Sequence, residues 1–181
     1  MNEIAHACKR ILDAKAVQMY KQVEISSGVP WYLIGALHYR EASLNFLGHL
    51  HNGDYLKRLT YHVPPNRPNP PEQWPIVPWN AEQAWIISAN DALTKLSDMT
   101  DTWTLEWMLY ACERYNGWGY QNHKGFVTPY LWNYTDVYKG CGYPADGVWS
   151  SSYHSRQAGL VPILKILAQM APTQIAINYS P

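Results

Sequence analysis

The sequence predicts a mainly α-helical protein that folds as a single domain over residues 1–181. A length of 181 residues is enough for one compact core and short for two. The composition, 47% hydrophobic and 15% charged, is typical of a well-packed globular chain. Apolar residues recur at three- and four-residue steps along most segments, which is the spacing of amphipathic helices.

The first predicted helix covers residues 2–25. Its apolar positions lie at helical spacing: Ile4, Cys8, Ile11, Leu12, Ala16, Met19 and Val23. The run Ser26-Ser27-Gly28-Val29-Pro30 then interrupts the pattern, with Pro30 suited to a helix start. A second helix is expected over residues 31–43, and one of its faces carries Ile34, Leu37 and Glu41.

Two irregular segments follow. Residues 44–62 are polar, and Asn52-Gly53-Asp54 is a strong turn signal. Residues 63–79 contain seven prolines, which exclude a helix and indicate an extended surface loop or lid with Trp74 and Trp79 at its base.

Helices resume over residues 80–99, behind a possible Asn80 cap, and over residues 102–115. A loop-rich segment is expected over residues 116–154, and a last helix over residues 155–171. The tail after Pro172 is expected to be frayed.

Charge and cysteine content restrict the partners and the compartment. The formal net charge is zero, which disfavours binding to nucleic acid. Three widely spaced cysteines, Cys8, Cys112 and Cys141, suggest reduced thiols of a protein made in the cytoplasm. The sequence shows neither a secretory signal nor a stretch long enough for membrane insertion. We expect a monomer without cofactor or metal.

Glu41 is the leading candidate for catalysis. A carboxyl near the C-terminal end of an apolar helix meets desolvation and the negative end of the helix dipole, and both raise its pKa. A carboxyl that keeps its proton near neutrality can serve as general acid toward a glycosidic oxygen. Asp54 and Thr60, on the turn-rich segment behind it, supply the second carboxylate and a hydroxyl.

Two motifs resemble known families. The run Ala36-Leu37-His38-Tyr39-Arg40-Glu41-Ala42-Ser43-Leu44-Asn45-Phe46 is similar to the catalytic helix of lytic transglycosylases and goose-type lysozymes. The segment Leu109-Tyr110-Ala111-Cys112-Glu113-Arg114-Tyr115-Asn116-Gly117-Trp118-Gly119-Tyr120 is similar to their Tyr-Asn-Ala-Gly segment, which faces the acid. Here Ala42 separates Glu41 from Ser43, and Gly117-Trp118 replaces Ala-Gly.

The set Glu41, Asp54 and Thr60 also resembles the Glu, Asp, Thr triad of phage-type lysozymes, with a longer gap between the two acids. Together the motifs resemble a bacteriophage or prophage endolysin of the lysozyme-like superfamily over roughly residues 28–160. The resemblance implies a lysozyme-like fold with a substrate cleft. It also implies a muramidase that cleaves the N-acetylmuramic acid–N-acetylglucosamine β-1,4 bond of peptidoglycan glycan strands.

In this reading Glu41 protonates the leaving oxygen, while Asp54, ionised in a wetter loop, and Thr60 position the attacking water. A separation of the carboxyls of about 6.5–9.5 Å would invert the anomeric configuration, and one near 5 Å would retain it. A lytic transglycosylase, which forms a 1,6-anhydro end without water, remains an alternative. The enzyme would reach the cell wall after membrane permeabilisation.

Substrate contacts are assigned to Tyr115 and Asn116 by the resemblance, and to Trp118 and Tyr120 as sugar-stacking walls. Nine Trp and fourteen Tyr suit this role, because their rings stack on sugars and their polar edges form hydrogen bonds.

Two other functions stay open. His38, His49 and His51 lie close to acids in the sequence and would suit a zinc-dependent peptidoglycan peptidase or amidase, although the His-Glu-x-x-His pattern is missing. A non-catalytic glycan-binding module would use the aromatic residues without needing Glu41.

Overall fold

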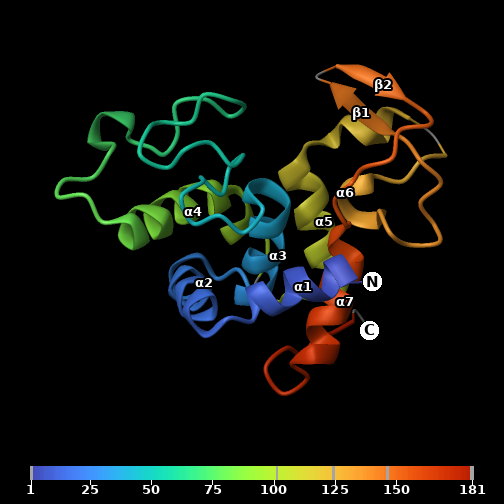
Figure 1. The fold of residues 1–181 in the computed structure, drawn as a ribbon, viewed down its shortest axis with the longest axis horizontal. Helices are drawn as coiled ribbons and strands as arrows, with labels where there is room; N and C mark the ends of the chain where they lie inside the picture. Colours follow the sequence, from blue (N-terminus) through green and yellow to red (C-terminus); the bar gives the residue numbers. More distant parts are fainter. Residues whose placement is uncertain (1, 101, 124, 146, 180–181) are drawn as a thin grey trace. The chain divides into compact units, whose positions relative to one another are not determined.

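Helices dominate the computed structural model, which describes residues 2–100, 102–123, 125–145 and 147–179 (Figure 1). Within those residues the structure has seven α-helices, which confirms the mainly α-helical class. They are α1 (Asn2–Ile11), α2 (Ala14–Ser27), α3 (Trp31–Ala42), α4 (Ala81–Ser97), α5 (Leu105–Asn116), α6 (Pro129–Trp132) and α7 (Leu160–Met170). Two short 3-10 helices, η1 (Pro71–Gln73) and η2 (Trp118–Asn122), and the strands β1 (Gly142–Ala145) and β2 (Val148–Ser150) complete the regular structure of the described residues.

The chain divides into two compact units. Residues 9–102 form one, which we call the inserted unit, and residues 1–8 together with 103–181 form the other, the terminal unit. The boundary falls within α1. Organisation as one domain over residues 1–181 stays a prediction.

Helices α2, α3 and α4 build the inserted unit, with α2 packed against both of the others (Figure 1). Close approach depends on Gly35 of α3, because a Cβ there would lie 2.6 Å from Cγ2 of Ile11. The largest fully buried side chains of this core are Ile11, Tyr20, Leu33, Ile34, Leu37, Leu50, Leu56, Trp85, Leu93 and Leu96.

The first predicted helix is wrong in one respect, since the chain breaks at Leu12 and Asp13 into α1 and α2. Asp13 takes the N-cap position of α2, where its side chain accepts hydrogen bonds from the backbone N–H groups of Lys15 (3.0 Å) and Ala16 (3.3 Å). A capping aspartate satisfies backbone donors that have no partner in the first turn, and this starts a new helix inside an unbroken apolar pattern.

The middle of the chain follows the prediction more closely. Residues 44–62 are irregular, and residues 63–79 are non-helical apart from the three-residue η1. Asn80 caps α4 as expected and accepts from the N–H of Gln83 at 3.0 Å.

In the terminal unit, α5 begins three residues later than predicted. Thr104 is its N-cap and its hydroxyl accepts from the N–H of Trp107 at 3.4 Å. The core of this unit contains Cys8, Met108, Ala111, Cys112, Leu160, Ile163 and Leu167.

The loop-rich segment 116–154 contains regular structure that the sequence pattern did not predict. Helix α6 lies within it, and β1 pairs antiparallel with β2, with Gly142 opposite Ser150. The last helix starts at Leu160, and the residues before it are held in a non-helical loop: the Asn133 amide donates to the carbonyls of Ser155 (2.8 Å) and Gln157 (2.6 Å).

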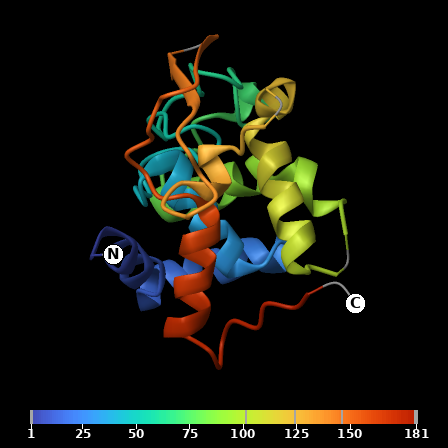
Figure 2. The same ribbon diagram turned by 90° about the vertical axis from the view of Figure 1, so that its right-hand side faces the viewer.

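The tail after Pro172 is not frayed over its described part, which corrects the prediction. Ile175 is buried, and the carbonyl of Asn178 accepts from the N–H of Leu105 at 2.7 Å. Figure 2 shows the tail running from the end of α7 to the start of α5, where Thr104 and Asn178 form a parallel bridge. Backbone pairing fixes this tail at a helix start that would otherwise lack partners.

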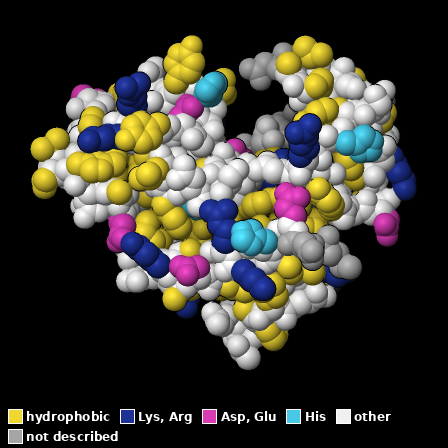
Figure 3. Space-filling model, in the orientation of Figure 1, with side chains coloured by type: hydrophobic (Ala, Val, Ile, Leu, Met, Phe, Trp, Pro, Cys, Tyr) yellow, Lys and Arg dark blue, Asp and Glu magenta, His cyan; other side chains and the backbone are white. Residues whose placement is uncertain are grey.

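On the face shown in Figure 3, basic and acidic side chains are interspersed, in keeping with the zero net charge. Among the described residues, no helix has both the length and the apolar character needed to cross a membrane.

Candidate active site

Glu41 is the penultimate residue of α3, as the sequence predicts. Ten of the twelve residues of this helix are buried, and Glu41 is half-buried. The chain then leaves the helix through two left-handed residues that are not glycine, Ser43 (φ 51°) and Leu44 (φ 60°). Arg10 stabilises this exit by donating to the carbonyl of Leu44 at 3.1 Å. Strained backbone of this kind is concentrated at functional sites.

The turn 52–54 packs directly on the end of α3. Gly53 has φ +79°, and a Cβ there would lie 2.6 Å from the main-chain oxygen of Glu41. Its N–H donates to the carbonyl of His49 at 2.9 Å, which closes the turn. Only glycine fits this position. Asp54 is the next residue, so it lies directly after the contact between the turn and the backbone of Glu41.

Asp54 accepts three hydrogen bonds from the next segment of the loop. Its carboxylate receives the backbone N–H groups of Tyr61 (2.7 Å) and His62 (2.8 Å), and the imidazole Nδ1 of His62 (2.6 Å). Burial of the carboxyl opposes ionisation, but the bonds from His62 and Tyr61 outweigh it and lower the pKa of Asp54. These hydrogen bonds favour the ionised form of the carboxylate.

The surroundings of Asp54 differ from the wetter loop that we expected. The Asp54 side chain is 15% exposed, whereas that of His62 is 72% exposed. Hydrogen bonds rather than water stabilise the charge.

Thr60 is buried and secures the base of the Pro-rich segment. Its hydroxyl donates to the carbonyl of Pro64 at 2.6 Å and accepts from the N–H of Arg67 at 2.9 Å. Asp54 and Thr60 thus lie in one loop, where Asp54 binds the residue after Thr60. The hydrogen of the Thr60 hydroxyl is already donated to Pro64 within this loop.

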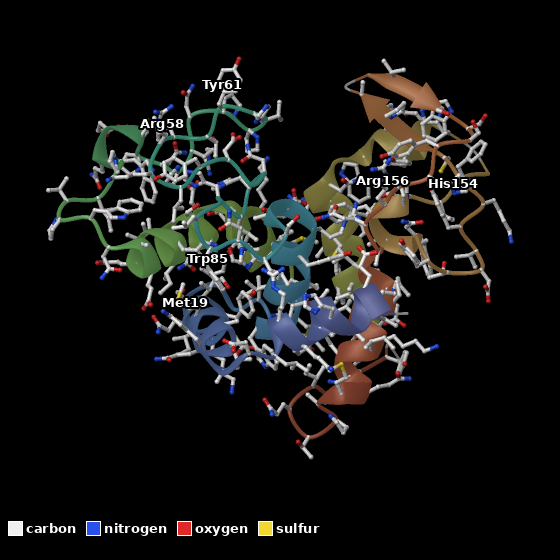
Figure 4. All side chains as sticks on the ribbon, viewed as in Figure 1. Met19, Arg58, Tyr61, Trp85, His154 and Arg156 are labelled. Atoms are coloured by element: carbon white, nitrogen blue, oxygen red, sulfur yellow. The ribbon has the colours of Figure 1, made fainter. Side chains whose placement is uncertain are left out.

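The aromatic residues near the loop also have defined partners. The indole N–H of Trp74 donates to the carbonyl of Leu56 at 2.9 Å, and its ring lies 6.4 Å from that of Trp79. Tyr61, labelled in Figure 4, projects outward from the loop and is 84% exposed.

The three histidines of the zinc alternative have separate partners. His38 is fully buried, with Nδ1 2.9 Å from the hydroxyl of Tyr20, and burial lowers the pKa of His38 to about 4. His49 lies 2.6 Å from the hydroxyl of Ser88 through Nδ1 and 2.7 Å from the carbonyl of Arg58 through Nε2.

His51 completes this set. Its Nε2 lies 2.9 Å from Asp91, whose other oxygen accepts from Arg67 at 2.8 Å. Burial lowers the pKa of His51, and the Asp91 carboxylate opposes the shift. In the described part of the chain, no group of three or more His, Cys, Asp or Glu side chains has a geometry that could hold a metal ion.

The predicted substrate contacts belong to the terminal unit, whereas Glu41, Asp54 and Thr60 belong to the inserted unit. Tyr115 is half-buried near the end of α5, and Asn116 is the exposed last residue of that helix. Tyr120 is half-buried, its ring lies 5.3 Å from that of Tyr143, and burial raises its pKa to about 12.

Trp118 forms part of an exposed aromatic row on α5 and η2. Its ring lies 5.3 Å from that of Tyr110, which lies 5.7 Å from that of Trp107. The exposed fractions of Trp107, Tyr110 and Trp118 are 40%, 48% and 37%. Rings of this kind offer apolar faces with polar edges to a sugar chain.

Comparisons of the chain with family models, with curated proteins and with solved structures gave no match.

Two residues that sequence reasoning passed over are now prominent. His62 has the closest side-chain contact with Asp54, and no sequence spacing rule pairs a histidine with an aspartate eight positions earlier. Glu113 of α5 is half-buried, and burial raises its pKa to about 7. The two apolar residues before Glu113, Ala111 and Cys112, were the available signal in the sequence.

An apolar pocket of about 340 Å³ lies between the starts of α2 and α4. Ala16, Met19 and Phe46 line it, and an ion pair between Lys15 and Glu82 (2.6 Å) lies at its margin. Met19 is labelled in Figure 4. The residues that line this pocket do not include any predicted site residue.

Proposed function

We propose that the protein is a peptidoglycan glycosidase that cleaves the N-acetylmuramic acid–N-acetylglucosamine bond with Glu41 as general acid. One observation carries the proposal: the turn 52–54 packs on the backbone of Glu41, so that an ionised Asp54 follows directly after this contact. Glycoside cleavage needs two carboxyl groups in different environments, one that delivers a proton and one that carries negative charge.

The role of Glu41 follows from its position at the helix end. The residue is half-buried and lies in the last turn of α3, near the negative end of the helix dipole. Its proton would pass to the glycosidic oxygen as the bond to the anomeric carbon breaks.

Asp54 supplies the negative charge of the site. An ionised carboxylate stabilises the positive charge that develops on the sugar ring.

A lytic transglycosylase is the second candidate, and the contacts of Thr60 favour it. The Thr60 hydroxyl donates to Pro64, and the Asp54 carboxylate accepts three hydrogen bonds, so both groups are engaged within the loop. Without a positioned water, the C6 hydroxyl of the muramic acid would attack and give a 1,6-anhydro end.

The test uses purified peptidoglycan sacculi and the variant Glu41→Gln, which keeps the shape of the side chain and removes the acid. We expect the formation of new glycan ends to fall by about 100-fold or more, while binding to sacculi is unchanged. Glu72→Gln, which alters an exposed carboxylate in η1, is the control and should act like the parent.

The products separate the candidates. Reducing muramic ends indicate hydrolysis, and 1,6-anhydro ends indicate transglycosylation. If Glu41→Gln produces ends at the parent rate, Glu41 is not the general acid and the proposal is wrong. If the parent binds sacculi but produces no new ends, a glycan-binding module is the better account.

A further inference from the structure

The Asp54–His62 pair has the geometry of an oriented imidazole. Nδ1 of His62 lies 2.6 Å from Oδ1 of Asp54, while Oδ2 accepts the backbone N–H groups of Tyr61 and His62. Because an ionised carboxylate only accepts, Nδ1 carries the hydrogen of this bond. Nε2 of the neutral ring then bears the lone pair.

The imidazole lies on the solvent side of the pair. Its side chain is 72% exposed, and that of Asp54 is 15% exposed. A carboxylate that holds one ring nitrogen of a histidine fixes both the tautomer and the ring orientation. The second nitrogen is then available to a water or substrate.

The same turn connects His62 with Glu41. The Asn52 amide donates to the carbonyl of His62 at 3.1 Å, so both the backbone and the ring of His62 are bonded to the turn 52–54. Gly53 in the centre of this turn contacts the main-chain oxygen of Glu41. The turn 52–54 therefore contacts the backbone of Glu41 on one side and holds the ring and backbone of His62 on the other.

We propose that His62, oriented by Asp54, is the general base that activates water in the hydrolysis catalysed by this site; this inference rests on the proposed glycosidase function. The imidazole Nε2 accepts one proton from water as the water oxygen bonds to the anomeric carbon. Glu41 gives its proton to the leaving oxygen as the glycosidic bond breaks. Asp54 stays ionised and stabilises the imidazolium, which later returns its proton through solvent to the Glu41 carboxylate.

Asp54 itself is a poorer base than its neighbour. Three donors already engage its oxygens, and these bonds stabilise the ionised form. Histidine is the side chain most often used to accept a proton near neutral pH. In the transfer of the proton from water, Asp54 is accordingly a positioning residue, while its negative charge still stabilises the sugar ring.

Two variants of His62 distinguish a general base from a residue that only stabilises the loop. His62→Asn keeps an N–H donor near the place of Nδ1 and removes the base, while His62→Ala leaves space for free imidazole. On purified sacculi we expect both variants to lose about 10²–10⁴-fold in the rate of new reducing ends, with unchanged binding. His62→Asn, which keeps a donor to Asp54, should also keep the thermal unfolding midpoint of the parent. Added imidazole should restore part of the activity of His62→Ala, but have no effect on the parent or on Glu41→Gln.

The control is His6→Asn, which changes an exposed histidine of α1 and should act like the parent. The base assignment would be overturned by full activity in His62→Asn, by a loss in His62→Ala that imidazole does not rescue, or by 1,6-anhydro products. In each of these cases an inactive Glu41→Gln would leave the glycosidase proposal standing. A parent that produces no new ends, or a Glu41→Gln as active as the parent, would instead overturn the proposed function and this inference with it.

Discussion

Glu113 carries a protonation state that should govern the stability of α5. Burial raises its pKa from 4.5 to about 7, so the native state holds this proton at pH values where the unfolded chain has lost it. The free energy of unfolding must then fall as the pH rises from 4.5 to 7. Glu113→Gln removes this penalty. We expect the variant to match the parent near pH 5 and to be about 1–2 kcal/mol more stable near pH 8, after allowance for solvent screening.

Urea unfolding of the parent and of Glu113→Gln at both pH values measures the difference. Glu72→Gln, which changes an exposed carboxylate, should show no pH-dependent gain. Equal stability of Glu113→Gln and the parent near pH 8 would show that the carboxyl is ionised without cost.

At the residue scale, the sequence predicted positions better than partners. Glu41 was placed correctly because helical spacing and the break at residue 43 determine where α3 ends. The partners of Asp54 were not predictable, because its bonds to Tyr61 and His62 depend on how an irregular loop closes on itself. Hydrogen bonds within loops follow no periodic rule.

At the scale of elements, the turn 52–54 and helix α3 form the central contact of the candidate site. Gly53→Ala places a methyl group 2.6 Å from the main-chain oxygen of Glu41 and also requires φ +79° of a residue with a side chain. We expect a loss of about 1–3 kcal/mol in the free energy of unfolding. Cleavage of sacculi should fall as well, because Asp54 must shift with respect to Glu41.

Gly28→Ala is the matched control for this prediction. Gly28 caps α2 with φ +70°, and a Cβ there would meet no atom within 4 Å. It therefore reports the conformational penalty alone, about 1 kcal/mol, with cleavage unchanged. Chemical denaturation and rates of end formation for both variants check the comparison. Equal losses in the two variants would mean that the contact with Glu41 tolerates a methyl group.

Element boundaries show why sequence patterns fail at particular places. The apolar spacing of residues 2–25 continues through Asp13, so periodicity alone could not reveal that this side chain caps a new helix. The start of α7 was predicted too early because Asn133, distant in sequence, holds the carbonyls of Ser155 and Gln157. At the start of α7, these two tertiary hydrogen bonds from Asn133 override the local preference of residues 155–159 for a helix.

At the scale of the whole molecule, the course of the chain makes one unit dependent on the other. The terminal unit is assembled from residues 1–8 and 103–181, and residues 9–102 connect its two parts. Length and composition predicted enough core for one domain, but they carry no information on a discontinuous unit. Docking of the tail at Leu105 was likewise unpredictable, because it depends on a backbone bond over more than seventy residues.

The three cysteines provide a probe of this dependence. Cys8, Cys112 and Cys141 are buried thiols of the terminal unit, and burial raises the pKa of Cys8 to about 11. Thiolate is the reactive form, so all three should resist labelling until the terminal unit opens.

We expect the thiols to become reactive at or below the denaturant concentration that unfolds the inserted unit. Once residues 9–102 unfold, the terminal unit must close a long flexible loop, at an entropic penalty of about 4 kcal/mol. Thiol labelling along a urea series, compared with hydrogen exchange of α3 followed by mass spectrometry, tests this order. Coincident transitions would agree with one cooperative domain, and earlier labelling with a less stable terminal unit. Thiols that stay protected where α3 has fully exchanged would contradict the prediction, because the terminal unit would then be stable across an unfolded insertion.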